Sequence, residues 1–73
     1  MTQILDARGL SCPQPLILTT RALKQSDAPF DVLVDDVVAR ENILRMLADR
    51  YGLTPDVLTE GDVFRIQIRR AGT

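Results

Sequence analysis

One stretch of the chain carries both its only cysteine and a change from strand to helix: Leu5-Asp6-Ala7-Arg8-Gly9-Leu10-Ser11-Cys12-Pro13-Gln14-Pro15. Alternation before Arg8 predicts a strand over Gln3–Ala7. Gly9 indicates a turn that a Cβ would obstruct. A helix is then expected to start at Cys12-Pro13, because proline at the first helical position loses no hydrogen bond.

Outward from this stretch, periodicity predicts a second helix and three further strands. The expected elements are a helix over Cys12–Gln25, a strand over Phe30–Asp35, a helix over Val37–Tyr51, and strands over Thr54–Glu60 and Val63–Arg70. Asp36 is the expected N-cap of the second helix, and Gly52 is expected just past its end. The last two strands, joined by a tight turn at Glu60-Gly61-Asp62, should form a hairpin.

This order, βαβαββ, predicts an α/β two-layer sandwich: a four-stranded mixed sheet with two helices on one face. In the first helix, the expected buried stripe is Pro13, Leu16, Thr20 and Leu23. The other face of the sheet should meet solvent through polar residues, with a weak apolar patch at Leu33 and Val63. Those polar residues are Asp31, Asp35, Arg65, Gln67 and Arg69.

Length and composition predict one domain over residues 1–73. The apolar fraction of 45% is that of a globular chain, and a net charge of −1 gives no reason to expect nucleic-acid binding. We expect a cytoplasmic protein without membrane association, because the single cysteine cannot form an internal disulfide and no signal peptide or membrane-spanning run is seen.

Cys12 is the candidate reactive group. A thiol at a helix N-terminus is favoured as thiolate by the partial positive charge of the helix end, which lowers its pKa. Arg8, four residues earlier, would add a second positive influence. Pro13 and Pro15 would keep the first turn rigid and free of competing donors, and Gly9 would form the turn before it. The alternative is a lone cysteine that serves as a small buried hydrophobic residue.

The rest of the composition excludes most cysteine chemistry. The chain has no histidine to act as base and no second cysteine to resolve a disulfide. It has no metal-ligand cluster and no phosphate-binding glycine loop, so neither a metal nor a cofactor is expected. A reactive thiol without a base or partner thiol points to covalent carriage of a group.

The opening stretch strongly resembles the signature of TusA/SirA-like proteins, in which a strand and turn lead into a Cys-Pro-x-Pro helix start. Two further segments resemble the second-helix entry of the YedF-like branch: Val34-Asp35-Asp36 and Ala39-Arg40-Glu41-Asn42. Val37 stands where many TusA proteins carry proline, which favours the YedF-like branch over the tRNA-thiolation branch.

The resemblance implies a sulfur carrier rather than a stand-alone enzyme. Such proteins hold sulfur as a persulfide on the cysteine that corresponds to Cys12. A donor such as a cysteine desulfurase or rhodanese-like protein supplies it, and an acceptor protein takes it. The implied fold is the same βαβαββ sandwich. Asp35, Asp36 and Arg40, the last expected on the solvent side of the second helix, are candidate contacts with these partners.

Two functions of other classes stay open at this point. In one, the chain is a nucleic-acid-binding or regulatory module that uses Arg65, Arg69 and Arg70. In the other, it is an interaction domain in which Cys12 is only structural. Cys12→Ser separates them from a carrier, because only a carrier loses its activity while it stays folded.

Overall fold

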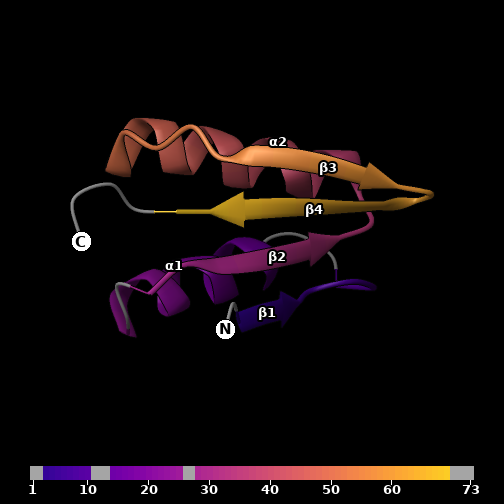
Figure 1. Ribbon diagram of the computed structural model, residues 1–73, viewed down its shortest axis with the longest axis horizontal. Helices are drawn as coiled ribbons and strands as arrows, with labels where there is room; N and C mark the ends of the chain where they lie inside the picture. The colour runs from indigo at the N-terminus through magenta and orange to yellow at the C-terminus, as the bar shows by residue number, and fades with distance from the viewer. Residues whose placement is uncertain (1–2, 11–13, 26–27, 70–73) are drawn as a thin grey trace.

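The computed structural model describes residues 3–10, 14–25 and 28–69, and in them the predicted order of elements is confirmed. The strands are β1 (Gln3–Asp6), β2 (Phe30–Val34), β3 (Asp56–Glu60) and β4 (Val63–Ile68). The helices are α1 (Gln14–Gln25) and α2 (Val37–Met46), and α2 continues into a π-helical turn, η1 (Leu47–Tyr51). Both helices lie in one layer behind the sheet (Figure 1).

The four strands form a mixed sheet in the order β1-β2-β4-β3. β2 is parallel to β1 and antiparallel to β4, and β3 pairs antiparallel with β4. The last strand therefore lies between β2 and β3 (Figure 1), which makes β1 and β3 the edge strands. Pro55 directly precedes the edge strand β3, a position where its missing N–H removes no interior ladder bond.

Alternate residues of the two central strands, β2 and β4, form the side of the core that the sheet contributes. Val32, Ile66 and Ile68 are at most 1% exposed, and Ile43 of α2 and Leu47 of η1 cover them and are completely buried. Each such side chain stabilises the fold by roughly 1.5–3 kcal/mol relative to an exposed position. The core is mostly aliphatic, as expected for a chain with three aromatic residues, and Phe30 is the aromatic residue buried in it.

The buried stripe of α1 differs from the predicted one. Pro15, Thr19 and Leu23 are buried, whereas Leu16 and Thr20 are only half-buried. The hydroxyl of Thr19 donates to the carbonyl oxygen of Pro15 at 2.8 Å, so this polar group is satisfied inside the core. The prediction placed Thr20 in the buried stripe because it did not consider that Thr19 could be buried with its hydroxyl bonded to a carbonyl of its own helix. Pro13 lies outside the described residues.

Both ends of the second helical segment follow the prediction. Asp36 caps α2 by accepting a hydrogen bond from the backbone N–H of Ala39 at 3.2 Å. Gly52 closes η1 in the left-handed conformation, with φ of 64°, and Leu53 N–H then bonds to Leu47 O at 3.0 Å.

The face of the sheet opposite the helices is less solvated than expected. Asp31 was predicted to meet solvent but is only 1% exposed. Its carboxylate accepts from Arg65 Nε at 2.7 Å and from Arg69 Nη1 at 3.0 Å. The side chains of Arg65 in β4 and of Arg69, directly after β4, therefore cover the carboxylate. Leu33 and Val63 are half-buried on this face, which is consistent with the weak apolar patch predicted there.

Candidate functional site

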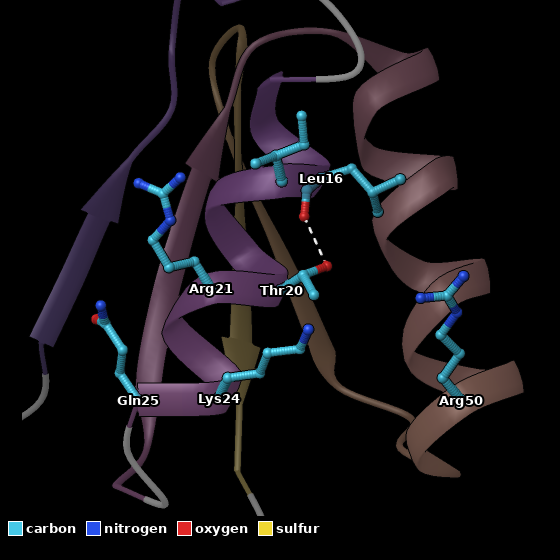
Figure 2. A pocket seen from close by; sticks show the side chains of 7 residues that line it. Leu16, Thr20, Arg21, Lys24, Gln25 and Arg50 are labelled. Carbon is cyan, nitrogen blue, oxygen red and sulfur yellow. Dashed lines mark hydrogen bonds between the residues drawn. The ribbon is translucent and has the colours of Figure 1, made fainter.

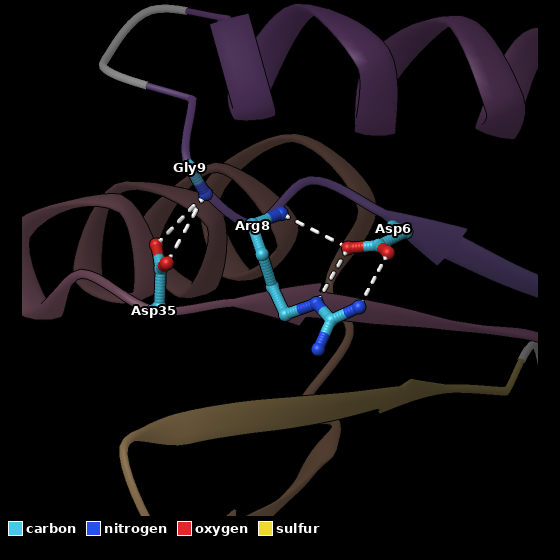
Figure 3. Close-up of polar contacts among 4 residues, drawn as sticks. All are labelled: Asp6, Arg8, Gly9 and Asp35. Atoms are coloured by element: carbon cyan, nitrogen blue, oxygen red, sulfur yellow. Dashed lines mark hydrogen bonds and ion pairs between the residues drawn. The ribbon is translucent and has the colours of Figure 1, made fainter.

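The loop after β1 is fixed by a contact from another element. Gly9 has φ of +76° and donates its N–H to both carboxylate oxygens of Asp35, at 3.1 Å each (Figure 3). A Cβ built on Gly9 would have no neighbouring atom within 4 Å. The predicted turn is therefore present, but the expected obstruction is not, and glycine is favoured here by its positive φ alone.

Arg8 is paired within the same loop. Its Nε and Nη2 bond to the two carboxylate oxygens of Asp6 at 2.9 and 2.8 Å, and its backbone N–H donates to the same carboxylate (Figure 3). These bonds to Arg8 lower the pKa of Asp6 from 3.8 to about 2, and the same pairing raises the pKa of Arg8. Arg8 is therefore half of an exposed ion pair rather than a lone cation.

The pairing changes the electrostatics expected before Cys12. The charge of Asp35 also raises the pKa of Arg8, but the guanidinium is hydrogen-bonded to Asp6. The field of Arg8 is largely cancelled by Asp6. The support that Arg8 was predicted to give a thiolate is correspondingly weaker, and the helix N-terminus becomes the main candidate source of that support.

Cys12 and Pro13 lie outside the described residues, between Leu10 and Gln14. The flanking residues, up to Leu10 and from Gln14 onward, are described. Gly9 is anchored to Asp35 on one side, and α1 begins at Gln14 on the other, with Pro15 buried in its first turn. A proline is accommodated there because the first N–H groups of a helix have no intrahelical acceptor.

The three candidate partner-facing residues all have partners inside the chain. Asp35 holds Gly9, and Asp36 caps α2. Arg40 was expected in solvent but is only 27% exposed, and its guanidinium lies over the ring of Phe64, 4.6 Å from the ring centre. Its Nε is 3.4 Å from a carboxylate oxygen of Glu41.

The contact between Gly9 and Asp35 was missed from sequence, although a signal existed. β1 and β2 are parallel, so their carboxyl ends meet at the same edge of the sheet. The residues that follow the two strands, Arg8-Gly9 and Asp35-Asp36, are therefore brought together. Reading the two strand ends jointly would have placed a carboxylate beside the loop that leads to Cys12.

Neither a metal cluster nor a membrane span emerges from the part of the chain that the structure describes. No group of three or more residues there could hold a metal ion. None of the described helices is both long and apolar enough to cross a bilayer.

The model of the family described as sulfurtransferase TusA matches residues 3–70. The chain belongs to this family. Its structure is similar to the crystal structure of a SirA-like protein from Desulfitobacterium hafniense, with a TM-score of 0.78 and 28% sequence identity. That similarity covers 94% of this chain and 100% of the other. Comparison with curated proteins gave no match.

Membership of the TusA family gives the chain a general role as a sulfur-carrier sulfurtransferase that works in a relay with partner proteins. The matched region contains the strand, the anchored loop and the helix on either side of Cys12.

Proposed function

We propose that Cys12 carries the transferred sulfur as a persulfide, which one protein loads and another unloads. The observation that carries the proposal is the family match over residues 3–70, which spans the only cysteine of the chain. A helix start favours an anion, and a persulfide is more acidic than a thiol, so the loaded form suits this position.

Loading requires no oxidant. The Cys12 thiolate attacks the outer sulfur of a donor persulfide and forms a new S–S bond. The S–S bond of the donor breaks, and its thiolate leaves with the electron pair. Delivery is the same exchange with an acceptor thiolate, or attack by another nucleophile of the acceptor on the outer sulfur. The absence of histidine is consistent with this step, because each partner can supply its own acid or base.

Asp35 acts in this proposal as a positioning residue. Its carboxylate holds the backbone of Gly9, three residues before Cys12, against the junction of β2 and α2. The same junction is fixed by the cap from Asp36. The loop leading to Cys12 is therefore hydrogen-bonded to the junction of β2 and α2, which the Asp36 cap holds in place. Pro15 holds the other side of the loop through its buried place in α1.

The donor is proposed to be a cysteine desulfurase or rhodanese-like protein, and the acceptor a protein of tRNA thiolation, cofactor synthesis, sulfur oxidation or selenium metabolism. The Asp35-Asp36-Val37 entry to α2 favours the YedF-like branch. We further propose that residues 1–73 form one domain and that the relay operates in the cytoplasm, where a lone thiol stays reduced.

Intact mass after incubation with a cysteine desulfurase and cysteine tests the proposal. We expect a gain of one sulfur atom that reductant removes and that Cys12→Ser abolishes. Cys12→Ser should retain its unfolding transition, which shows that the loss is chemical. If no donor, including a rhodanese-like protein, loads the wild-type chain, the proposal is wrong.

A nucleic-acid function gains little support from the sheet. Arg65 and Arg69, two of the arginines that suggested it, are both bonded to Asp31, so their charge is partly neutralised within the protein. Arg70 lies outside the described residues.

A further inference from the structure

A shallow groove runs between α1 and the second helical segment. Two adjoining hollows of about 440 and 280 Å³ share Leu16, Thr20 and Arg50 in their lining. Leu16 and Ile17 form an apolar strip along it, and Ile17 is 45% exposed. Figure 2 shows Arg21 and Arg50 on opposite sides of the larger hollow, with Lys24 between them.

Basic side chains outnumber acidic ones in the lining of the groove, as far as the structure describes it. Four of the nine basic residues of the chain line it, Arg21, Lys24, Arg45 and Arg50, and Asp49 is the one acidic residue among the described lining residues. Among the described residues, none of these four forms a salt bridge, whereas every other described basic side chain is paired. The paired residues are Arg8, Arg40, Arg65 and Arg69.

We propose that this interhelix groove binds an acidic, amphipathic segment of a partner protein in the sulfur relay. The inference rests on the proposed function for the identity of the partner as a relay protein. Carboxylates of the segment would pair with the four cations, and its apolar side chains would cover Leu16 and Ile17. A chain with a net charge of −1 would otherwise repel such a segment, so the concentrated cations supply the selectivity.

The position of the groove suits a docking role. α1 is 12 residues long, about 18 Å at 1.5 Å per residue, and Leu16 lies in its first turn whereas Lys24 lies in its last. Cys12 precedes this helix by two residues in the chain. A segment lying along α1 therefore binds the same helix that follows the sulfur-carrying residue, without depending on the thiol itself.

A nucleic acid fits the groove less well. Phosphates would pair with the four cations but would not pack against the apolar side chains of Leu16 and Ile17. Among the described residues, no aromatic side chain lines either hollow, so a base would have none to stack on. An acidic protein segment uses both features.

The test is a titration of peptide into the full chain, in which binding is monitored through the chemical shifts of the backbone amides. The probe is a synthetic acidic helix of about 14 residues, roughly four turns, with leucines on one face. Two comparison probes are a scrambled peptide of the same composition and a decathymidylate. We expect the acidic helix to bind tightest, to shift amides of residues 16–25 and 45–50, and to weaken as salt rises.

The groove variant is Arg21→Gln/Lys24→Gln, and the matched control is Thr54→Glu/Thr59→Glu, which makes the same change in net charge on exposed residues at the β3 side. The groove variant should weaken binding about fivefold, because each exposed charge pair contributes a fraction of a kcal/mol. The control should change the affinity by less than about twofold.

Several results would overturn the proposal: no binding of the acidic helix, equal binding of the scrambled peptide, tighter binding of the decathymidylate, or equal weakening by the control. Loading of Cys12 by inorganic polysulfide, measured by intact mass on the same samples, should be unchanged in the groove variant. If neither polysulfide nor the protein donors named above load wild type and variant, persulfide carriage fails, and the peptide titration still decides on the groove.

Discussion

Gly9 and Asp35, 26 residues apart in the chain, are joined by hydrogen bonds of 3.1 Å from one N–H to both carboxylate oxygens. The contact connects the loop after β1 to the end of β2, which are neighbours because the two strands are parallel. This contact makes the position of the loop depend on the sheet.

Asp35→Ala should slow sulfur transfer and lower the free energy of unfolding by about 1 kcal/mol, because the Gly9 N–H loses a charged acceptor at an exposed site. Asp35→Asn keeps an oxygen acceptor and should recover most of the transfer rate. Transfer is measured by the rate of persulfide gain in intact mass, and stability by urea unfolding.

Asp56→Asn is the matched control for Asp35→Asn, because it removes an exposed carboxylate from the edge strand β3, away from the loop. It should leave the transfer rate unchanged. If Asp35→Ala loses stability but transfers sulfur at the wild-type rate, the carboxylate is structural and does not position the loop.

Arg8→Gln should raise the pH midpoint of Cys12 alkylation, because it leaves the carboxylates of Asp6 and Asp35 uncompensated next to the loop. The double variant Asp6→Asn/Arg8→Gln removes one charge of each sign and should return the midpoint toward that of wild type. The measurement is the rate of iodoacetamide alkylation against pH. A midpoint that rises equally in both variants would show that Arg8 acts on the thiol as a free cation.

Stability should fall in acid through Asp31. Burial alone would raise the pKa of Asp31, but hydrogen bonds from Arg65 and Arg69 outweigh it and lower the pKa below the ordinary value. A lowered pKa stabilises the fold above the unfolded value of about 3.9, and this contribution is lost as pH falls through the folded value. Urea unfolding between neutral pH and pH of about 2 measures it.

Asp31→Asn should lower the free energy of unfolding at neutral pH by about 1–2 kcal/mol, since both arginines are partly exposed and can be solvated. It should also flatten the acid dependence. Asp6→Asn is the comparison, because the pKa of Asp6 is also lowered by an arginine, to about 2, but on the surface. An acid dependence that Asp31→Asn leaves unchanged would contradict the assignment.

Gly9→Ala should destabilise the fold by about 1 kcal/mol, because φ of +76° is unfavourable for an L side chain although no atom obstructs the added Cβ. Gly9→Asn should cost less, since asparagine tolerates this region better. Thermal unfolding of the two variants measures the difference. Equal and large losses in both would indicate a steric obstacle at this position instead of a backbone preference.

Local patterns were sufficient for most of the fold. Alternation at Phe30–Val34 and Val63–Ile68 identified the central strands, and Asp36 and Gly52 marked the two ends of the second helical segment. These signals work because strand faces, caps and left-handed turns depend on residues close together in the chain. In α1 the burial of Leu23 was predicted correctly, but Thr20 was expected to be buried instead of Thr19, because a threonine that bonds to its own helix can be buried.

The sequence by itself determined the element order, the two-layer class and the single cysteine before a helix, because these follow from periodicity, capping and composition. Only the tertiary structure decided that β4 lies between β2 and β3, that Asp31 is buried between two arginines, and that Asp35 holds Gly9. The reason is that each depends on which strand ends and faces meet, and the pairing of the strands in the sheet sets this rather than residue spacing alone. In the proposed function, the stretch around Cys12 supplies the thiol, and Asp35, directly after β2, anchors Gly9 in the loop that leads to it.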